Sequence, residues 1–232
     1  MKINVSTFKK AINPIIFGLI IFEICIPIIY LTSILITGRP DHLFDMNSDF
    51  TITSLLQALL LFFTGTITLI LLIYSKERPS RGFKIIMVLC FYYATIDEIF
   101  KIHLRFKNWF PDMNTRYWIG GYLGIIFILP VVFYRDIMNL WNNHRKETIF
   151  AISGAIIFVI GGFGLEILKD YILQPILLML FQNNHKFLPL MLEKIRISLE
   201  EYGEMLGETL IFYGFLRFGV KKLEKHEGVE IN

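Results

Sequence analysis

Six apolar segments, each about long enough to cross a lipid bilayer as a helix, recur along this chain of 232 residues. A helix needs roughly 20 residues to cross a hydrocarbon core of about 30 Å. Hydrophobic residues make up 54% of the chain and its mean hydropathy is +0.56, which is high for a soluble domain. No segment shows sustained alternation, so a closed strand barrel is not expected. The sequence predicts one all-α integral membrane domain over residues 1–232, a polytopic bundle with spans at 14–37, 52–74, 83–103, 117–134, 148–168 and 201–220.

The basic residues predict the orientation of this bundle. With the N-terminus inside, the inner segments hold more of the 23 Lys and Arg residues than the outer ones. We therefore expect a cell inner (cytoplasmic) membrane protein with both termini cytoplasmic and residues 221–232 as a short tail. Residues 183–199 are basic and amphipathic, which predicts an interfacial segment that leads into the sixth span. Residues 171–181 cover only about half a span, so they either continue the fifth helix or form an interfacial or re-entrant piece.

Carboxylates inside the spans are the main functional signal, because a charge in hydrocarbon is costly and is mostly retained for function. Asp97 and Glu98 lie in the outer third of the third span. Glu201, Glu204 and Glu208 are spaced i, i+3 and i+7 in the first half of the sixth span, which places them on one helix face. The topology brings these acids to one level of the membrane. We predict an ion- or substrate-binding site formed by Asp97, Glu98, Glu204 and Glu208.

Plain structural roles are open for some of these acids. Glu201 follows Ser198 at the spacing of a helix capping box, and acids in a first helical turn favour the positive end of the helix dipole. Asp97 has Lys101 one turn later, so an ion pair within the third helix is expected. These pairings compete with the binding-site interpretation.

A metal site is a second use of the same region. Carboxylate oxygens suit hard cations such as Mg²⁺, Ca²⁺ or Mn²⁺, so a divalent cation is a candidate cofactor. The chain has no Glu-x-x-His pair, which argues against a di-iron centre of the helix-bundle type. On a straight helix His103 faces away from Asp97, so a structural histidine is an equal alternative. The candidate metal ligands are Glu98, His103, Glu201 and Glu204.

Glu23 is a separate candidate near the middle of the first span. Pro27 follows four residues later and removes the N–H that would bond the carbonyl of Glu23. Broken helices at membrane depth are tolerated where they line protein or water. We therefore predict a deeper proton or ion site at Glu23, with a kink and a protonated carboxyl bonded to a neighbouring helix as the alternative.

Small and polar residues predict how the helices pack. Glycines four residues apart, at 120 and 124 and at 203 and 207, allow close approach of helices or an oligomer interface. Pro130 is expected to kink the fourth span. The two cysteines fall in apolar spans and indicate neither a disulfide framework nor a zinc site. The expected partners are the lipid bilayer and a homo-oligomer or membrane complex, with no nucleic acid. One face of the second span carries Thr53, Gln57, Thr64 and Thr68, which can bond across helices.

Two of these stretches resemble a known pattern. The segments TIDEIFKIH and EEYGEMLGETLIFYGF are similar to those of uncharacterised bacterial polytopic membrane proteins. That group carries Asp-Glu…His in one helix and Glu-Glu…Glu-Met-x-Gly in the last. This chain departs from the pattern at Leu104, where an acid is expected. The resemblance implies that the two helices form one site and supplies no activity. The matching residues are Asp97, Glu98, His103, Glu200, Glu201, Glu204, Met205 and Gly207.

Three functions fit these features. The favoured one is a transporter or channel component with an outward-facing acidic site inside the membrane for a cation or cationic solute. A membrane-embedded, metal-dependent enzyme acting on a lipid-like substrate would use the same carboxylates as ligands or as acid and base. A non-catalytic interaction subunit of a larger complex would use the acids only in ion pairs.

Overall fold

The computed structural model describes residues 5–103, 105, 116–173, 175 and 187–229, and this part of the chain is helical throughout apart from its connecting turns. This confirms the all-α prediction. The long elements are α1 (Val5–Thr37), α2 (Ile52–Tyr74), α3 (Arg81–Phe100), α5 (Arg116–Val132), α6 (Tyr134–Asn143), α7 (Arg145–Phe158) and α10 (Phe187–Val229). The helix that begins with α7 continues through a π-helical turn η1 (Val159–Gly164), α8 (Leu165–Leu168) and a second π-helical turn η2 (Lys169–Leu173).

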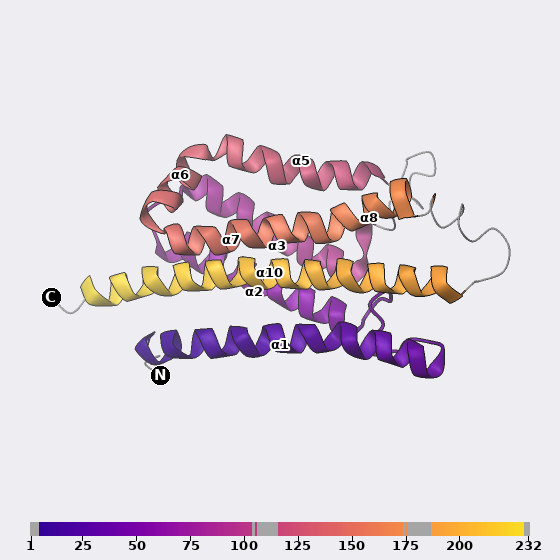
Figure 1. Ribbon diagram of the computed structural model, residues 1–232. Helices are drawn as coiled ribbons and strands as arrows, with labels where there is room; N and C mark the ends of the chain where they lie inside the picture. Colours follow the sequence, from indigo (N-terminus) through magenta and orange to yellow (C-terminus); the bar gives the residue numbers. More distant parts are fainter. Residues whose placement is uncertain (1–4, 104, 106–115, 174, 176–186, 230–232) are drawn as a thin grey trace.

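Helix α10 is the centre of the bundle. It packs against α7, α2 and α1, and α2 also packs along α3. In Figure 1, α5, α7, α10 and α1 follow one another from top to bottom, with α2 and α3 behind them. Both termini lie at the same end of the bundle (Figure 1), where Lys9 Nζ of α1 is 3.0 Å from Glu224 Oε2 of α10. We refer to this end as the terminal end and to the opposite one as the distal end.

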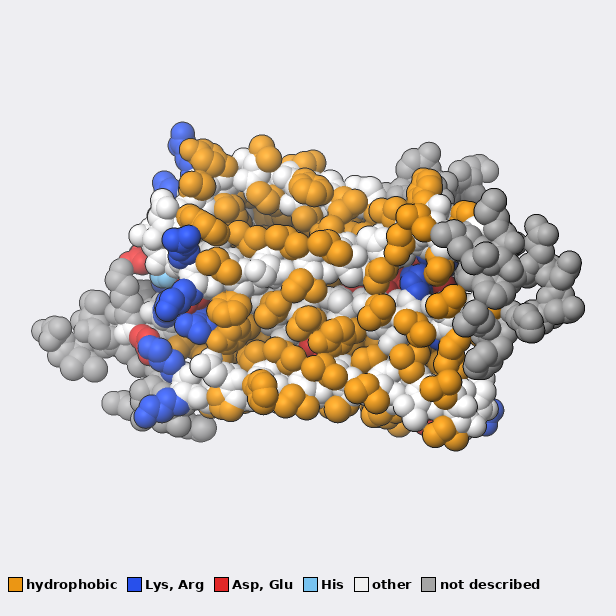
Figure 2. Space-filling model, viewed as in Figure 1, with side chains coloured by type: hydrophobic (Ala, Val, Ile, Leu, Met, Phe, Trp, Pro, Cys, Tyr) orange, Lys and Arg blue, Asp and Glu red, His pale blue; other side chains and the backbone are white. Residues whose placement is uncertain are grey.

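Several helices are long and apolar enough to cross a membrane. Three described stretches meet this condition, at Lys9–Thr37, Ile52–Tyr74 and Arg145–Leu173. Helices α5 and α6 meet it together, although they are bent by 73° at a break just after Val132. Figure 2 shows hydrophobic side chains covering the middle of one face of the molecule, while Lys and Arg gather at the terminal end. Length, composition and surface together indicate a helical membrane protein.

Two predicted boundaries are corrected by the structure. Helix α1 begins by Val5 rather than at Pro14, and it runs through Pro14 and Pro27 without ending. Helix α10 begins at Phe187, so the described part of the predicted interfacial segment, residues 187–199, is the first part of the long central helix. Ser198 therefore lies inside a helix, and the predicted capping box does not form. Residues 183–186 lie outside the described residues, as do 174 and 176–181, while the fifth helix itself continues through Leu173.

The close contact between α7 and α10 depends on glycine. A Cβ at Gly161 would lie 2.8 Å from the Cα of Gly203, and a Cβ at Gly207 would lie 2.7 Å from the carbonyl oxygen of Gly154. Real Cβ atoms do not approach other backbones this closely, so only glycine allows these backbones to meet. The predicted packing role of Gly203 and Gly207 thus has a direct explanation. By contrast, a Cβ at residue 120 or 124 would meet no described atom within 4 Å.

The polar face of α2 is buried as its pattern suggests. Thr53, Gln57, Thr64 and Thr68 are each at most 2% exposed. The hydroxyls of Thr64 and Thr68 donate to carbonyls of their own helix, four residues earlier, rather than across helices. The expected bond across helices is made by Gln57, whose amide reaches α10.

Candidate functional site

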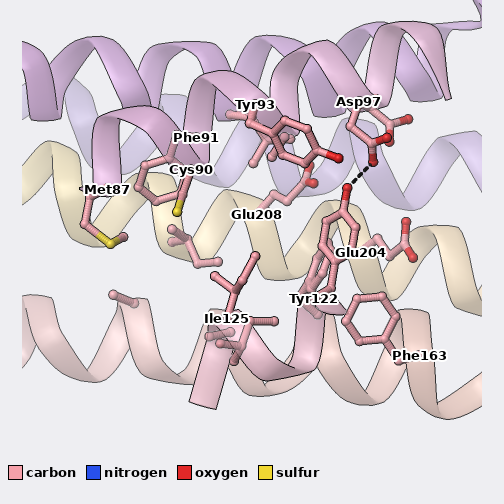
Figure 3. A pocket seen from close by; sticks show the side chains of 18 of the residues that line it. Met87, Cys90, Phe91, Tyr93, Asp97, Tyr122, Ile125, Phe163, Glu204 and Glu208 are labelled. Atoms are coloured by element: carbon pink, nitrogen blue, oxygen red, sulfur yellow. Dashed lines mark hydrogen bonds between the residues drawn. The ribbon is translucent and has the colours of Figure 1, made fainter. Parts of the chain in front are cut away.

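A cavity of about 850 Å³ lies among α3, α5, α7 and α10. Its lining changes along its length, as Figure 3 shows. Asp97 and Tyr93 of α3, Tyr122 of α5 and the acids of α10 lie toward one end, while Met87 and Cys90 of α3 lie toward the other. The structure therefore brings four of the predicted binding residues to one cavity: Asp97, Glu98, Glu204 and Glu208.

Helix α10 presents a row of carboxyls to this cavity. Glu201, Glu204 and Glu208 all line it, because their i, i+3 and i+7 spacing puts them on one face of a continuous helix. Glu208 is only 4% exposed, and its Oε2 has no hydrogen-bond partner within the described chain. Among the described residues, no basic side chain forms an ion pair with any of the three. Lys101, which pairs with Glu98, is the nearby cation that acts on them electrostatically. A buried acid without a direct ion pair, such as Glu208, is costly, which makes the row a candidate for a ligand.

Glu204 is held from two sides. Gln57 of α2, which is fully buried, donates from Nε2 to Glu204 Oε2 at 3.3 Å. On the other side the carboxyl lies against Gly162, where an added Cβ would be 3.1 Å from both Cγ and Cδ of Glu204 and nearer still to Oε1. Gly162 belongs to the π-helical turn η1, and such turns are frequent at functional sites because they shift a helix face locally. Glycine and π-turn together make room for this carboxyl.

The end of α3 turns one histidine back onto the cavity. Lys101 adopts a left-handed conformation with φ of 45°, so the helix ends there rather than continuing to residue 103 as predicted. After this turn, His103 donates its backbone N–H to Asp97 Oδ1 at 2.8 Å, and its Nδ1 lies 2.7 Å from Asp97 Oδ2. Tyr122 donates to the same Oδ2 at 2.6 Å. The expectation that His103 faces away from Asp97 is wrong, because it assumed a straight helix.

The ion pair within α3 also differs from the predicted one. Lys101 forms its ion pair with Glu98 rather than with Asp97. Both side chains are largely buried and line the cavity. Asp97 is bonded by His103 and Tyr122 instead, so α3 contributes two partnered acids opposite the unpaired row on α10.

A second group of acids in the lining of the same cavity is neutralised. Arg196 of α10 contacts Glu193, Glu200 and Glu166, and it is itself buried. Lys169 lies 3.5 Å from Glu193 and 3.8 Å from Glu166. Carboxylates and cations thus alternate in this cluster, which gives it a structural explanation. Glu200, which carries part of the sequence resemblance, belongs here rather than to the unpaired row.

Glu23 does not line the cavity. It is fully buried in α1, on the opposite side of α10, where Thr209 donates a hydrogen bond to its Oε1. Its other oxygen, Oε2, has no partner among the described residues. The carboxyl is therefore hydrogen-bonded to a neighbouring helix, which is one part of the alternative that the sequence left open.

The predicted metal ligands do not form a cluster. Among the described residues, no group of three or more His, Cys, Asp or Glu side chains is placed to hold a metal ion. His103 bonds with Asp97, Glu98 pairs with Lys101, and Glu204 is bonded by Gln57.

Sequence reasoning missed three residues that shape this site. Gln57 was predicted only to bond across helices and not to belong to the site, and neither Gly162 nor Tyr122 carried a prediction. The polarity of Gln57 inside an apolar span was a usable signal. Tyr122 gave none, because tyrosines are common near membrane interfaces.

The fold and cavity define a class, that of helical membrane proteins with an acidic cavity inside the bundle. The family described as a domain of unknown function, DUF8692, matches residues 18–218. The chain belongs to this family, and the matched range contains every residue of the cavity described above. No curated protein and no solved structure matches the chain.

Proposed function

We propose that this chain is a multi-pass inner-membrane protein that binds a cation or cationic solute at the carboxyls of the cavity, as a transporter or channel component. The single observation that carries the proposal is the row of Glu201, Glu204 and Glu208 along one cavity wall, which makes no direct ion pair among the described residues and faces one cation, Lys101, that is already paired with Glu98. A positively charged ligand would neutralise the row without the cost of a buried uncompensated charge.

Six spans with both termini cytoplasmic fit this proposal. Helices α3 and α10 run along the apolar helices of the bundle, so both can cross the membrane together with them (Figure 1). At about 1.5 Å per residue the 43 residues of α10 extend about 65 Å, well beyond the hydrocarbon core on both sides. The Lys and Arg side chains at the terminal end support the cytoplasmic placement of that end (Figure 2). The acids then lie in the outer half of the membrane.

Calorimetric titration in lipid nanodiscs tests the proposal. Tetramethylammonium chloride and MgCl₂ serve as separate probes of an organic and an inorganic cation. We expect saturable binding of a cation to the wild type and its loss in Glu204→Gln/Glu208→Gln. Glu224→Gln is the matched control, because Glu224 forms an ion pair with Lys9 at the terminal end, away from the cavity. Equal binding by the wild type and the double variant would contradict the proposal.

The interaction-subunit alternative makes a different prediction. It holds that the acids serve only in ion pairs, as Glu98 does with Lys101. Replacing both members of that pair, in Glu98→Gln/Lys101→Gln, would then leave every property of the protein unchanged. Under our proposal the same double variant keeps the fold but alters cation affinity, because the cavity wall changes its charge distribution.

A further inference from the structure

The cavity continues well beyond the carboxyls. Along α3, Met87, Cys90 and Phe91 line it, and Ile125 of α5 lies across from them (Figure 3). Cys90 precedes Asp97 by seven residues, which is about 10 Å along the helix axis at about 1.5 Å per residue. The cavity therefore joins an acidic compartment to an apolar compartment about two helical turns long.

The size of the cavity exceeds what a bare ion requires. It measures about 850 Å³, whereas one water molecule occupies about 30 Å³ in the liquid. Cavities of roughly 300–1,000 Å³ are those that enclose organic molecules of moderate size. An inorganic cation at the carboxyls would leave the apolar compartment unfilled, so the shape of the cavity calls for an occupant with an apolar part.

Charge decides which way such an occupant lies. At the far end of the apolar compartment, Lys84 donates from Nζ to the carbonyl oxygens of Ser75 at 2.5 Å and Glu77 at 3.2 Å. The ring of His144 there packs edge-on against Phe218 at 4.8 Å. The ammonium of Lys84 is thus already hydrogen-bonded within the protein, and the acid at this end, Glu147, is paired with Lys221 at 2.7 Å.

The acidic compartment, by contrast, holds more carboxyls than cations. Glu201, Glu204 and Glu208 make no direct ion pair among the described residues, because Lys101 pairs with Glu98, and aromatic rings lie beside them. The rings of Tyr93 and Tyr122 pack in a tilted arrangement at a centroid distance of 6.3 Å, and those of Tyr122 and Phe163 pack edge-on at 6.2 Å. All three rings line the cavity next to Glu204 and Glu208 (Figure 3). Aromatic faces next to carboxylates are the surroundings that an alkylated ammonium group prefers.

We propose that the cavity binds a single-chain amphiphile with an alkylammonium head from the lipid phase, with the head among Glu204, Glu208 and the aromatic rings and the hydrocarbon tail along Cys90. This rests on the proposed cation-binding function and names the class of ligand. The carboxyls fix the head by charge, and the apolar compartment adds affinity in proportion to the length of the tail, at about 0.8 kcal/mol per buried CH₂.

The two cysteines of the chain provide a direct test. Cys90 lines the apolar compartment, whereas Cys25 is exposed on the outer face of α1. The rate of alkylation by N-ethylmaleimide is measured in nanodiscs of zwitterionic lipid, on Cys25→Ser for Cys90 and on Cys90→Ser for Cys25. Dodecyltrimethylammonium at about ten times its dissociation constant is expected to slow Cys90 about tenfold by mass action and to leave Cys25 unchanged. Tetramethylammonium, which has no tail, is expected to leave Cys90 unprotected.

Two variants keep the test decisive. Glu204→Gln/Glu208→Gln, built on the Cys25→Ser background, should lose the protection of Cys90. Ile125→Trp enlarges the side chain that lies across from Cys90 in the apolar compartment, and it should abolish protection by the long-chain probe while calorimetric binding of tetramethylammonium persists, which also shows that the variant is folded.

The outcomes separate this inference from the function on which it rests. If tetramethylammonium binds through the carboxyls but dodecyltrimethylammonium does not protect Cys90, the amphiphile inference is overturned and the cation site stands. Equal protection by neutral dodecyl maltoside would also overturn it, because the head charge would then play no part. If neither ammonium compound binds, both the inference and the proposed function fail.

Discussion

The carboxyl of Glu204 lies directly against the Cα of Gly162, which belongs to the π-helical turn of the neighbouring helix. A methyl group at that position would collide with the end of the glutamate side chain. We therefore expect Gly162→Ala to displace Glu204, weaken cation binding and destabilise the fold by about 1–3 kcal/mol. Gly164→Ala is the control, since its Cβ would meet its nearest neighbour at 3.7 Å, an ordinary contact. Calorimetry and thermal unfolding of both variants check this, and equal behaviour of the two would refute the role of Gly162.

Lys84 stabilises the bundle at the terminal end by capping α2. Its buried ammonium donates to carbonyl oxygens at and just after the C-terminus of that helix. Lys84→Met should therefore cost about 1.5–3 kcal/mol, the range for hydrogen bonds that involve a charged group. Lys146→Met serves as a matched control, because Lys146 is exposed. Thermal unfolding in nanodiscs measures both, and a Lys84→Met protein as stable as the control would contradict the capping role.

Asp97 connects the end of α3 to α5 through its hydrogen bond with Tyr122. Asp97→Asn replaces one acceptor oxygen by an amide, so the hydroxyl of Tyr122 and the ring of His103 can no longer both be satisfied as they are now. We expect a loss of about 1.5–3 kcal/mol, and a smaller loss of about 1 kcal/mol for Tyr122→Phe, which removes a single donor. Measuring the free energy of unfolding of Asp97→Asn, of Tyr122→Phe and of the double variant gives the interaction energy between the two residues. Strictly additive losses would argue against a shared hydrogen-bond network.

The pH dependence of stability should contain a contribution from His144. This residue lies between α6 and α7, outside the apolar stretches, and burial is the main cause that lowers its pKa below the usual 6.5, with Lys222 and Lys221 acting in the same direction. Below about pH 6.5 the unfolded chain therefore binds a proton that the folded one does not. Stability is complete above that pH and falls as the pH drops through it. His144→Gln should therefore lose less stability than the wild type as the pH falls below about 6.5. Thermal unfolding as a function of pH measures this, and the same pH dependence in both proteins would contradict the role of His144.

The helices themselves were predictable because apolar length and composition are local properties. Each of the six apolar segments is helical over most of its length, and the burial of Gln57 and its neighbours on α2 follows from their spacing. The start of α10 was not predictable from the capping pattern at Ser198, because the same residues are compatible with a helix interior. Continuity of a helix over polar residues depends on tertiary contacts such as those of Arg196.

The sequence predicted which acids belong to the candidate site, but it did not predict which residues those acids bond with. Spacing alone placed Glu201, Glu204 and Glu208 on one face, and the structure has them on one cavity wall. The bonding partners of Asp97 and Glu98 depend on the left-handed conformation of Lys101. A lysine seldom adopts this conformation, and no local sequence pattern predicts it here. Likewise, only the packing of η1 on α10 explains why residue 162 is a glycine.

The most direct measurement is site-resolved labelling of the cavity carboxyls with dicyclohexylcarbodiimide, which reacts with carboxyls in apolar surroundings, followed by peptide mass spectrometry. If Glu204 and Glu208 line a cavity without basic partners and bind a cation, one or both are labelled in the free protein, and a bound alkylammonium compound protects them. Glu200 and Glu193, which contact Arg196, should stay unlabelled under both conditions. Labelling of Glu204 and Glu208 that no cation reduces, or labelling confined to the paired acids, would contradict the account.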